Sequence, residues 1–111
     1  MNIDLIKLTK TLGDFTTENL NELLDQRDSS LFETLWLEAR AEVPEGKAPE
    51  ELKHIFISVS NATNQHEIAS YIADDIELIS HAKMSESKNK FVIQLAKKYA
   101  NGEFPHEIQS V

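Results

Sequence analysis

Residues 64–83, NQHEIASYIADDIELISHAK, contain the longest amphipathic pattern of the chain and indicate its fold class. Apolar residues recur there at three- and four-residue steps, which is the repeat of one face of a helix. They are Ile68, Tyr71, Ile72, Ile76, Ile79 and Ala82. Asn64 followed by Glu67 three residues later has the spacing of a capping box. We therefore predict a helix over residues 65–83 with Asn64 as its N-cap.

Helical spacing also predominates on both sides of this stretch. We predict helices over residues 2–12, ending at Gly13, and 16–27, with Thr16 as N-cap. The stretch Ser30-Leu31-Phe32-Glu33 has capping-box spacing and should open a third helix. A last helix over residues 86–100 should bury Phe91, Val92, Leu95 and Tyr99 and stop at Asn101-Gly102.

Two parts of this pattern leave alternatives open. In the third helix Leu31, Leu35 and Ala39 fall on one line, and Trp36 beside them is either a core residue or an exposed binding anchor. The stretch 52–60 contains Ile55-Phe56-Ile57-Ser58-Val59, which favours a strand by composition and a helix by spacing. Because no other segment offers a partner strand, we favour the helix.

These segments predict an all-α protein, a compact bundle of five or six short helices in one domain over residues 1–111. About twenty buried Leu- or Ile-sized residues, each contributing roughly 1.5–3 kcal/mol, can support a domain of this size. We therefore expect a monomer.

Composition limits the cellular compartment and the classes of partner that we expect. The chain has 111 residues and no cysteine, which excludes a disulfide or a thiolate metal site and fits a reducing compartment. Its beginning has no basic segment followed by an apolar one, and its apolar runs are far shorter than the roughly 20 residues of a membrane span. We expect a cytoplasmic protein. The net charge of −8 disfavours direct nucleic-acid binding, because phosphates would be repelled.

The acidic residues are unevenly distributed. Residues 14–51 contain eleven carboxylates and three basic residues, and residues 65–81 contain four acids and no lysine or arginine. Residues 83–98 contain five lysines and one glutamate. Such segregation either keeps the protein soluble or produces a field that attracts a cationic partner.

No motif for catalysis, a metal or a cofactor accompanies these acids. There is no phosphate-binding glycine loop and no nucleophile elbow. Glu67, Asp74 and His81 share one helical face, but neighbours are two turns apart, roughly 10 Å, which is too far for one ion to bridge. We predict a protein that is not an enzyme and has no catalytic or metal-ligating residue and no cofactor.

Two segments carry a family resemblance. Tyr71-Ile72-Ala73-Asp74-Asp75-Ile76-Glu77-Leu78-Ile79, followed by Tyr99-Ala100-Asn101-Gly102-Glu103-Phe104-Pro105, resembles the C-terminal half of small helical immunity proteins. These accompany bacterial contact-dependent inhibition and colicin-type toxins. The resemblance implies a cytosolic protein that binds one cognate toxin domain, often a nuclease, and blocks it. Many such toxins are basic because they bind phosphate backbones.

Charge and resemblance together give the leading hypothesis, an acidic immunity protein that neutralises a cationic, nuclease-type toxin domain. The predicted partner-binding residues are Glu18, Glu22, Asp25, Asp28, Asp74 and Glu77. They would steer the partner and form charge-assisted hydrogen bonds with its Lys or Arg side chains. The alternatives are a DNA mimic or regulatory adaptor that binds a basic host protein, and a small enzyme using Asp74, Glu77 and His81.

Overall fold

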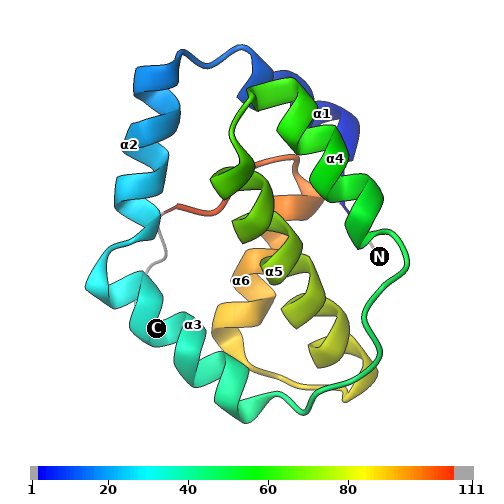
Figure 1. Cartoon of the computed structure of the whole chain (residues 1–111). Helices are drawn as coiled ribbons and strands as arrows, with labels where there is room; N and C mark the ends of the chain where they lie inside the picture. The colour runs from blue at the N-terminus through cyan, green and yellow to red at the C-terminus, as the bar shows by residue number, and fades with distance from the viewer. Residues whose placement is uncertain (1–2, 107–111) are drawn as a thin grey trace.

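The computed structural model describes residues 3–106, and this part of the chain contains six helices and no strand (Figure 1). The helices are α1 (Leu5–Gly13), α2 (Thr17–Arg27), α3 (Ser30–Glu42), α4 (Leu52–Thr63), α5 (His66–Met84) and α6 (Lys90–Ala100). The predicted all-α fold is confirmed. The stretch 52–60 is helical and forms most of α4.

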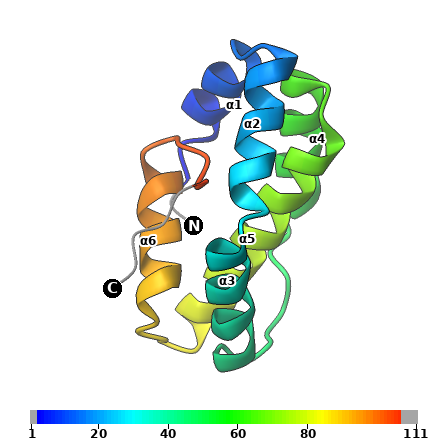
Figure 2. The ribbon, with the colours of Figure 1, turned by 90° about the vertical axis from the view of Figure 1, so that its left-hand side faces the viewer.

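Helix α5 is the centre of the arrangement. α4 and α6 pack against it, α1 packs on α4, and α3 packs on α6. α2 and α3 follow one another along a single face of the molecule, with α6 and α4 on either side (Figure 2). The acid-rich first half of the chain therefore supplies one continuous face, formed by α2 and α3.

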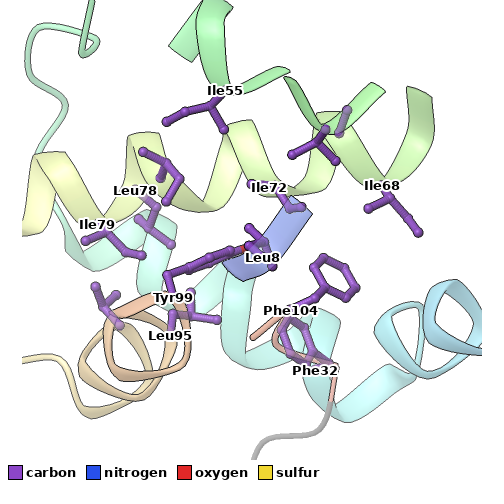
Figure 3. Packing of buried hydrophobic residues seen from close by; sticks show 14 of the residues in the cluster. Leu8, Phe32, Ile55, Ile68, Ile72, Leu78, Ile79, Leu95, Tyr99 and Phe104 are labelled. Atoms are coloured by element: carbon purple, nitrogen blue, oxygen red, sulfur yellow. The ribbon is translucent and has the colours of Figure 1, made fainter. Parts of the chain in front are cut away.

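The burial of α5 explains its central place. Nine of its nineteen residues are buried, which is more than the single stripe expected of a surface helix. Side chains from the surrounding helices converge on it, and Figure 3 labels Leu8, Phe32, Ile55, Leu95 and Tyr99 among them. A helix apolar over so much of its circumference must be enclosed, so the other elements are arranged around it.

The predicted helix caps are partly correct. Thr16 caps α2 as predicted and accepts a hydrogen bond from the Asn19 N–H at 3.1 Å. Asn64 was predicted wrongly: it ends α4 in the left-handed region (φ 56°) and donates to the Ser60 carbonyl, while Gln65 precedes α5. Asparagine tolerates this conformation better than most residues, so one helix ends where the next was predicted to begin.

The other differences concern α1, α3 and α6. α1 begins only at Leu5, after Asp4 as its N-cap, and includes Gly13, which was predicted to end it. Ser29, not Ser30, caps α3, and the buried face includes Phe32, Ala39 and Val43, while Leu31 is 53% exposed. The last helix starts at Lys90, four residues later than predicted, because Glu86 adopts a left-handed φ of 56° that interrupts helical geometry. Its buried residues, Phe91, Val92, Leu95 and Tyr99, are those predicted.

Core packing predicts a large difference between two isoleucine truncations. Ile72 is 0% exposed at the centre of α5, whereas Ile6 on α1 is 84% exposed. We expect Ile72→Ala to lower the free energy of unfolding by about 2–5 kcal/mol, because it removes buried methyl groups and leaves a cavity. Ile6→Ala should change it by no more than about 0.5 kcal/mol. Urea denaturation measures both, and equal effects would contradict this packing.

Candidate partner-binding site

A buried carboxylate on α5 connects four helices. Asp75 is fully buried, and its Oδ1 accepts hydrogen bonds from the Arg27 guanidinium of α2 and from Trp36 Nε1 of α3, the latter at 2.9 Å. Its Oδ2 accepts from the Tyr99 hydroxyl of α6 at 2.5 Å. Three donors from three helices therefore meet one carboxylate. We call Asp75, Arg27, Trp36 and Tyr99 the Asp75 network.

Arg27 is buried too, with 5% of its surface exposed against 0% for Asp75. Its Nη1 donates to the Pro105 carbonyl at 3.3 Å, which ties the segment after α6 to α2. The guanidinium lies over the rings of Phe32, Tyr71 and Phe104, with centroids at 4.3, 5.1 and 5.3 Å. The charge is thus enclosed by aromatic faces on which a planar cation is well accommodated.

Burial opposes both charges of the pair. Burial raises the pKa of Asp75. The charge of Arg27 and the hydrogen bonds that the carboxylate accepts lower this pKa, but they do not cancel the effect of burial. Burial is also the largest single effect on Arg27 and lowers its pKa, but the charges of Asp75 and Tyr99 and the hydrogen bonds to both groups together outweigh burial, so the Arg27 pKa is raised. The ion pair between the two groups offsets part of the cost of burying each charge.

A surface pocket of about 270 Å³ opens outward from this network, between α2, α3 and α5. Its lining combines aromatic side chains with three carboxylates. The lining residues are Arg27, Asp28, Phe32, Glu33, Trp36, Leu37, Tyr71 and Asp74. We call this space the α2–α3–α5 pocket.

The carboxylates of the pocket perturb their neighbours. The Tyr71 hydroxyl donates to Asp28 Oδ1 at 2.5 Å, and this hydrogen bond, followed by burial and the charge of Asp28, raises the pKa of Tyr71 to about 12. Burial, together with the charges of Asp75 and Glu77, raises the pKa of Asp74. In both cases the charge of a neighbouring carboxylate adds to the shift.

The structure brings two of the six predicted binding residues into this pocket, Asp28 and Asp74. Glu77 is half-buried on α5 outside the lining. Glu18, Glu22 and Asp25 are exposed in one row on α2, opposite its buried face. Within residues 3–106 the ion pairs are Arg27–Asp75, Arg40–Glu45 and Lys98–Glu103, and none includes any of the six.

Several residues of the pocket were not among the six predicted binding residues. Trp36, for which a core position and an exposed anchor were both considered, is half-buried and lines the pocket. Phe32, Glu33, Trp36 and Tyr71 come from two helices whose contact no local pattern reveals. A signal for the Asp75 network was nevertheless present. Asp75 follows Ile68 and Ile72 at apolar positions of α5, and Arg27 follows Leu20 and Leu24 on the apolar face of α2. Opposite charges at two core-facing positions indicate a buried ion pair.

The structure separates the groups of the enzyme alternative. His81 is buried and Glu77 is half-buried, whereas Asp74 is exposed, so the three are not presented to one space. Glu67, which shares a helical face with Asp74 and His81 by its seven-residue spacing, is exposed as well. Across the described residues no three His, Asp or Glu side chains are placed to hold a metal ion. Within residues 3–106 no helix is both long enough and apolar enough to span a membrane.

Removing the buried charge tests the Asp75 network. We expect Asp75→Asn to lower the free energy of unfolding by about 3–5 kcal/mol, because Arg27 would remain buried without a counter-charge. The matched control is Glu103→Gln, which breaks the half-exposed pair with Lys98 and should cost less than about 1 kcal/mol. Chemical denaturation compares the two, and similar losses would contradict a dominant buried pair.

The Asp28–Tyr71 hydrogen bond predicts an unusual alkaline titration. The folded state keeps the Tyr71 proton to about pH 12, whereas the unfolded state loses it near pH 10, so stability should fall as pH rises through this interval. Absorbance of tyrosinate should show no ionisation near pH 10, since the other tyrosine, Tyr99, also has a strongly raised pKa. Asp28→Asn should return the Tyr71 pKa toward 10. Wild-type ionisation near pH 10 would contradict this geometry.

Comparison with known proteins identifies the family. A family model described as Immunity protein PIM1 matches residues 4–106, which include all six helices, the Asp75 network and the α2–α3–α5 pocket. No curated protein and no solved structure matches the chain. The match extends beyond the C-terminal half that carried the resemblance seen in the sequence. The chain therefore belongs to the family of PIM1 immunity proteins.

Proposed function

We propose that this chain neutralises one cognate, cationic toxin domain by binding it directly, with the acidic residues of α2 and α5 as the contact surface. Membership of an immunity-protein family is the observation that carries the proposal. An immunity protein acts by binding a toxin, so the task requires a complementary surface rather than reactive groups. We place this binding in the cytoplasm, with one chain per toxin domain.

Electrostatics supports the choice of surface. Glu18, Glu22 and Asp25 are exposed and form no ion pair within residues 3–106, so their charges are available to a partner. Asp28 and Asp74 continue this acidic area into the α2–α3–α5 pocket, and Glu77 lies close enough to Asp74 to raise its pKa. A toxin that binds phosphate backbones is basic, and opposite potentials accelerate encounter and align the two proteins.

The row on α2 is suited to steering. Its carboxylates project away from the core face that contains Leu20, Leu24 and Arg27, so substitution there leaves packing intact. Exposed charge pairs contribute little to equilibrium stability of a complex but raise association rates strongly at low salt. We therefore assign the outer face of α2 mainly to the rate of association.

Salt titration of toxin binding tests this function. With the toxin domain encoded by the neighbouring gene as probe, the association rate constant should fall at least about tenfold between 50 and 500 mM NaCl. Glu18→Gln/Glu22→Gln should lower the low-salt rate and flatten its salt dependence. Glu50→Gln/Glu51→Gln removes the same charge from exposed positions before α4 and is the control. Stopped-flow fluorescence measures the rates; salt-independent association, or equal effects of the two variants, would count against the proposal.

A further inference from the structure

We propose that the α2–α3–α5 pocket receives the side chain of an arginine from the toxin domain. This inference rests on the proposed function and specifies the contact that fixes the complex once the two proteins have met. The observations behind it are the size of the pocket, the chemistry of its walls and the state of its charges.

The pocket has the dimensions of a side-chain site. Its volume of about 270 Å³ is below the roughly 300–1,000 Å³ of pockets that enclose drug-sized ligands. Phe32, Trp36 and Tyr71 supply aromatic surface, and Leu37, which is 57% exposed, adds an apolar edge. Trp and Tyr are the residues in which interface energy is most often concentrated. One long side chain therefore fits this space better than a metabolite does.

The charges of the pocket select a cation. Asp28, Glu33 and Asp74 contribute three carboxylates to the lining. Arg27 also lines it, but its charge is paired with Asp75, and the charge of Asp75 acts on Asp74 more strongly than the charge of Arg27 does. The Tyr71 hydroxyl uses one position on Asp28, and a carboxylate offers about four acceptor positions. The pocket thus presents unused acceptors beside aromatic faces.

The walls are held in place before any partner arrives. Trp36 is fixed by its hydrogen bond to Asp75 at 2.9 Å, and Tyr71 by its hydrogen bond to Asp28 at 2.5 Å. Side chains that are already ordered lose little further freedom on association, which favours tight binding. The Asp75 network therefore preorganises the pocket as well as joining the helices.

Arginine fits this combination better than lysine. A guanidinium is planar, stacks on aromatic rings, and carries five donors that can reach more than one carboxylate. The guanidinium of Arg27 already lies over the rings of Phe32, Tyr71 and Phe104, so these aromatic side chains accept a guanidinium within the same protein. A lysine ammonium is a strongly hydrated point charge and would use the flat walls less well.

Isosteric neutral variants test the pocket in the folded protein. Asp74→Asn and Glu33→Gln should each weaken binding of the neighbouring-gene toxin domain about tenfold or more, as measured by calorimetry at 150 mM NaCl. Glu38→Gln is the matched control, because it removes the same charge from an exposed position of α3 outside the lining, and should change affinity less than threefold.

Stability separates a binding role from a structural one. The pKa of Asp74 is raised in the folded protein, so its ionised form is less favourable there than in the unfolded chain. Asp74→Asn should therefore unfold at the same or a higher urea concentration than wild type while it binds the toxin less tightly. Loss of stability in parallel with loss of binding would overturn the assignment of Asp74.

Substitutions on the toxin identify the residue that enters the α2–α3–α5 pocket. Each surface arginine and lysine of the toxin domain is changed to alanine and combined with Asp74→Asn in a double-mutant cycle. One arginine should couple to Asp74 by a factor of about ten or more. Coupling to a lysine alone would overturn the arginine assignment, and equal behaviour of the Asp74, Glu33 and Glu38 variants would overturn the pocket as a contact site.

Failure of the proposed function gives a different result. If the wild-type chain does not bind the toxin domain, the proposed function is wrong, and the pocket is then tested alone with N-acetylarginine amide as probe. Trp36 is the only tryptophan, so its indole N–H signal in an NMR spectrum reports on this pocket specifically. The arginine compound should shift this signal, whereas the neutral citrulline analogue should not. Equal shifts would overturn the inference.

Discussion

The buried ion pair between Asp75 and Arg27 is the constraint on which the arrangement of the helices depends. A charge in a protein interior is stable only when a partner and hydrogen bonds compensate for lost hydration. Asp75 obtains these from α2, α3 and α6, and Arg27 reaches the Pro105 carbonyl beyond α6. Apolar packing around α5 tolerates small sliding movements, but the donors at this carboxylate require one register. The pair thus specifies how α2, α3 and α6 meet α5.

The same pair connects the core to the molecular surface. Trp36 contributes an N–H to Asp75 and part of its ring to the α2–α3–α5 pocket, while Arg27 lies beneath the aromatic walls. Residues that hold the helices together therefore also form part of the proposed contact site. The acids at the mouth of the pocket are different, because Glu33 and Asp74 form none of the ion pairs within residues 3–106. Ordered walls and unpaired carboxylates are a combination that suits the binding of a cationic group.

The sequence predicted the elements better than their contacts. The pattern of Ile68, Ile72 and Ile76 identified α5, because helical periodicity is a local property. Asn64 was misassigned as an N-cap because asparagine also suits the C-terminal end of a helix. Ser30 was misassigned because the adjacent serine, Ser29, suits the same position. Asp28 and Asp74 were predicted as binding residues by charge alone, and their common pocket also requires Trp36 and Tyr71. That convergence depends on the packing of three helices, which no local pattern encodes.

The two faces of α2 differ in how freely their residues can change during evolution. Its inner face carries Leu20, Leu24 and Arg27, which the fold requires, and its outer face carries the exposed carboxylates of Glu18, Glu22 and Asp25, which are not part of the core. Mutations can therefore accumulate on the outer face while the domain continues to fold. A lineage facing a changing antagonist would be able to alter recognition in single steps, without passing through misfolded intermediates. Variation among natural homologues should then be concentrated on that exposed row and be rare at the positions of Asp75 and Arg27.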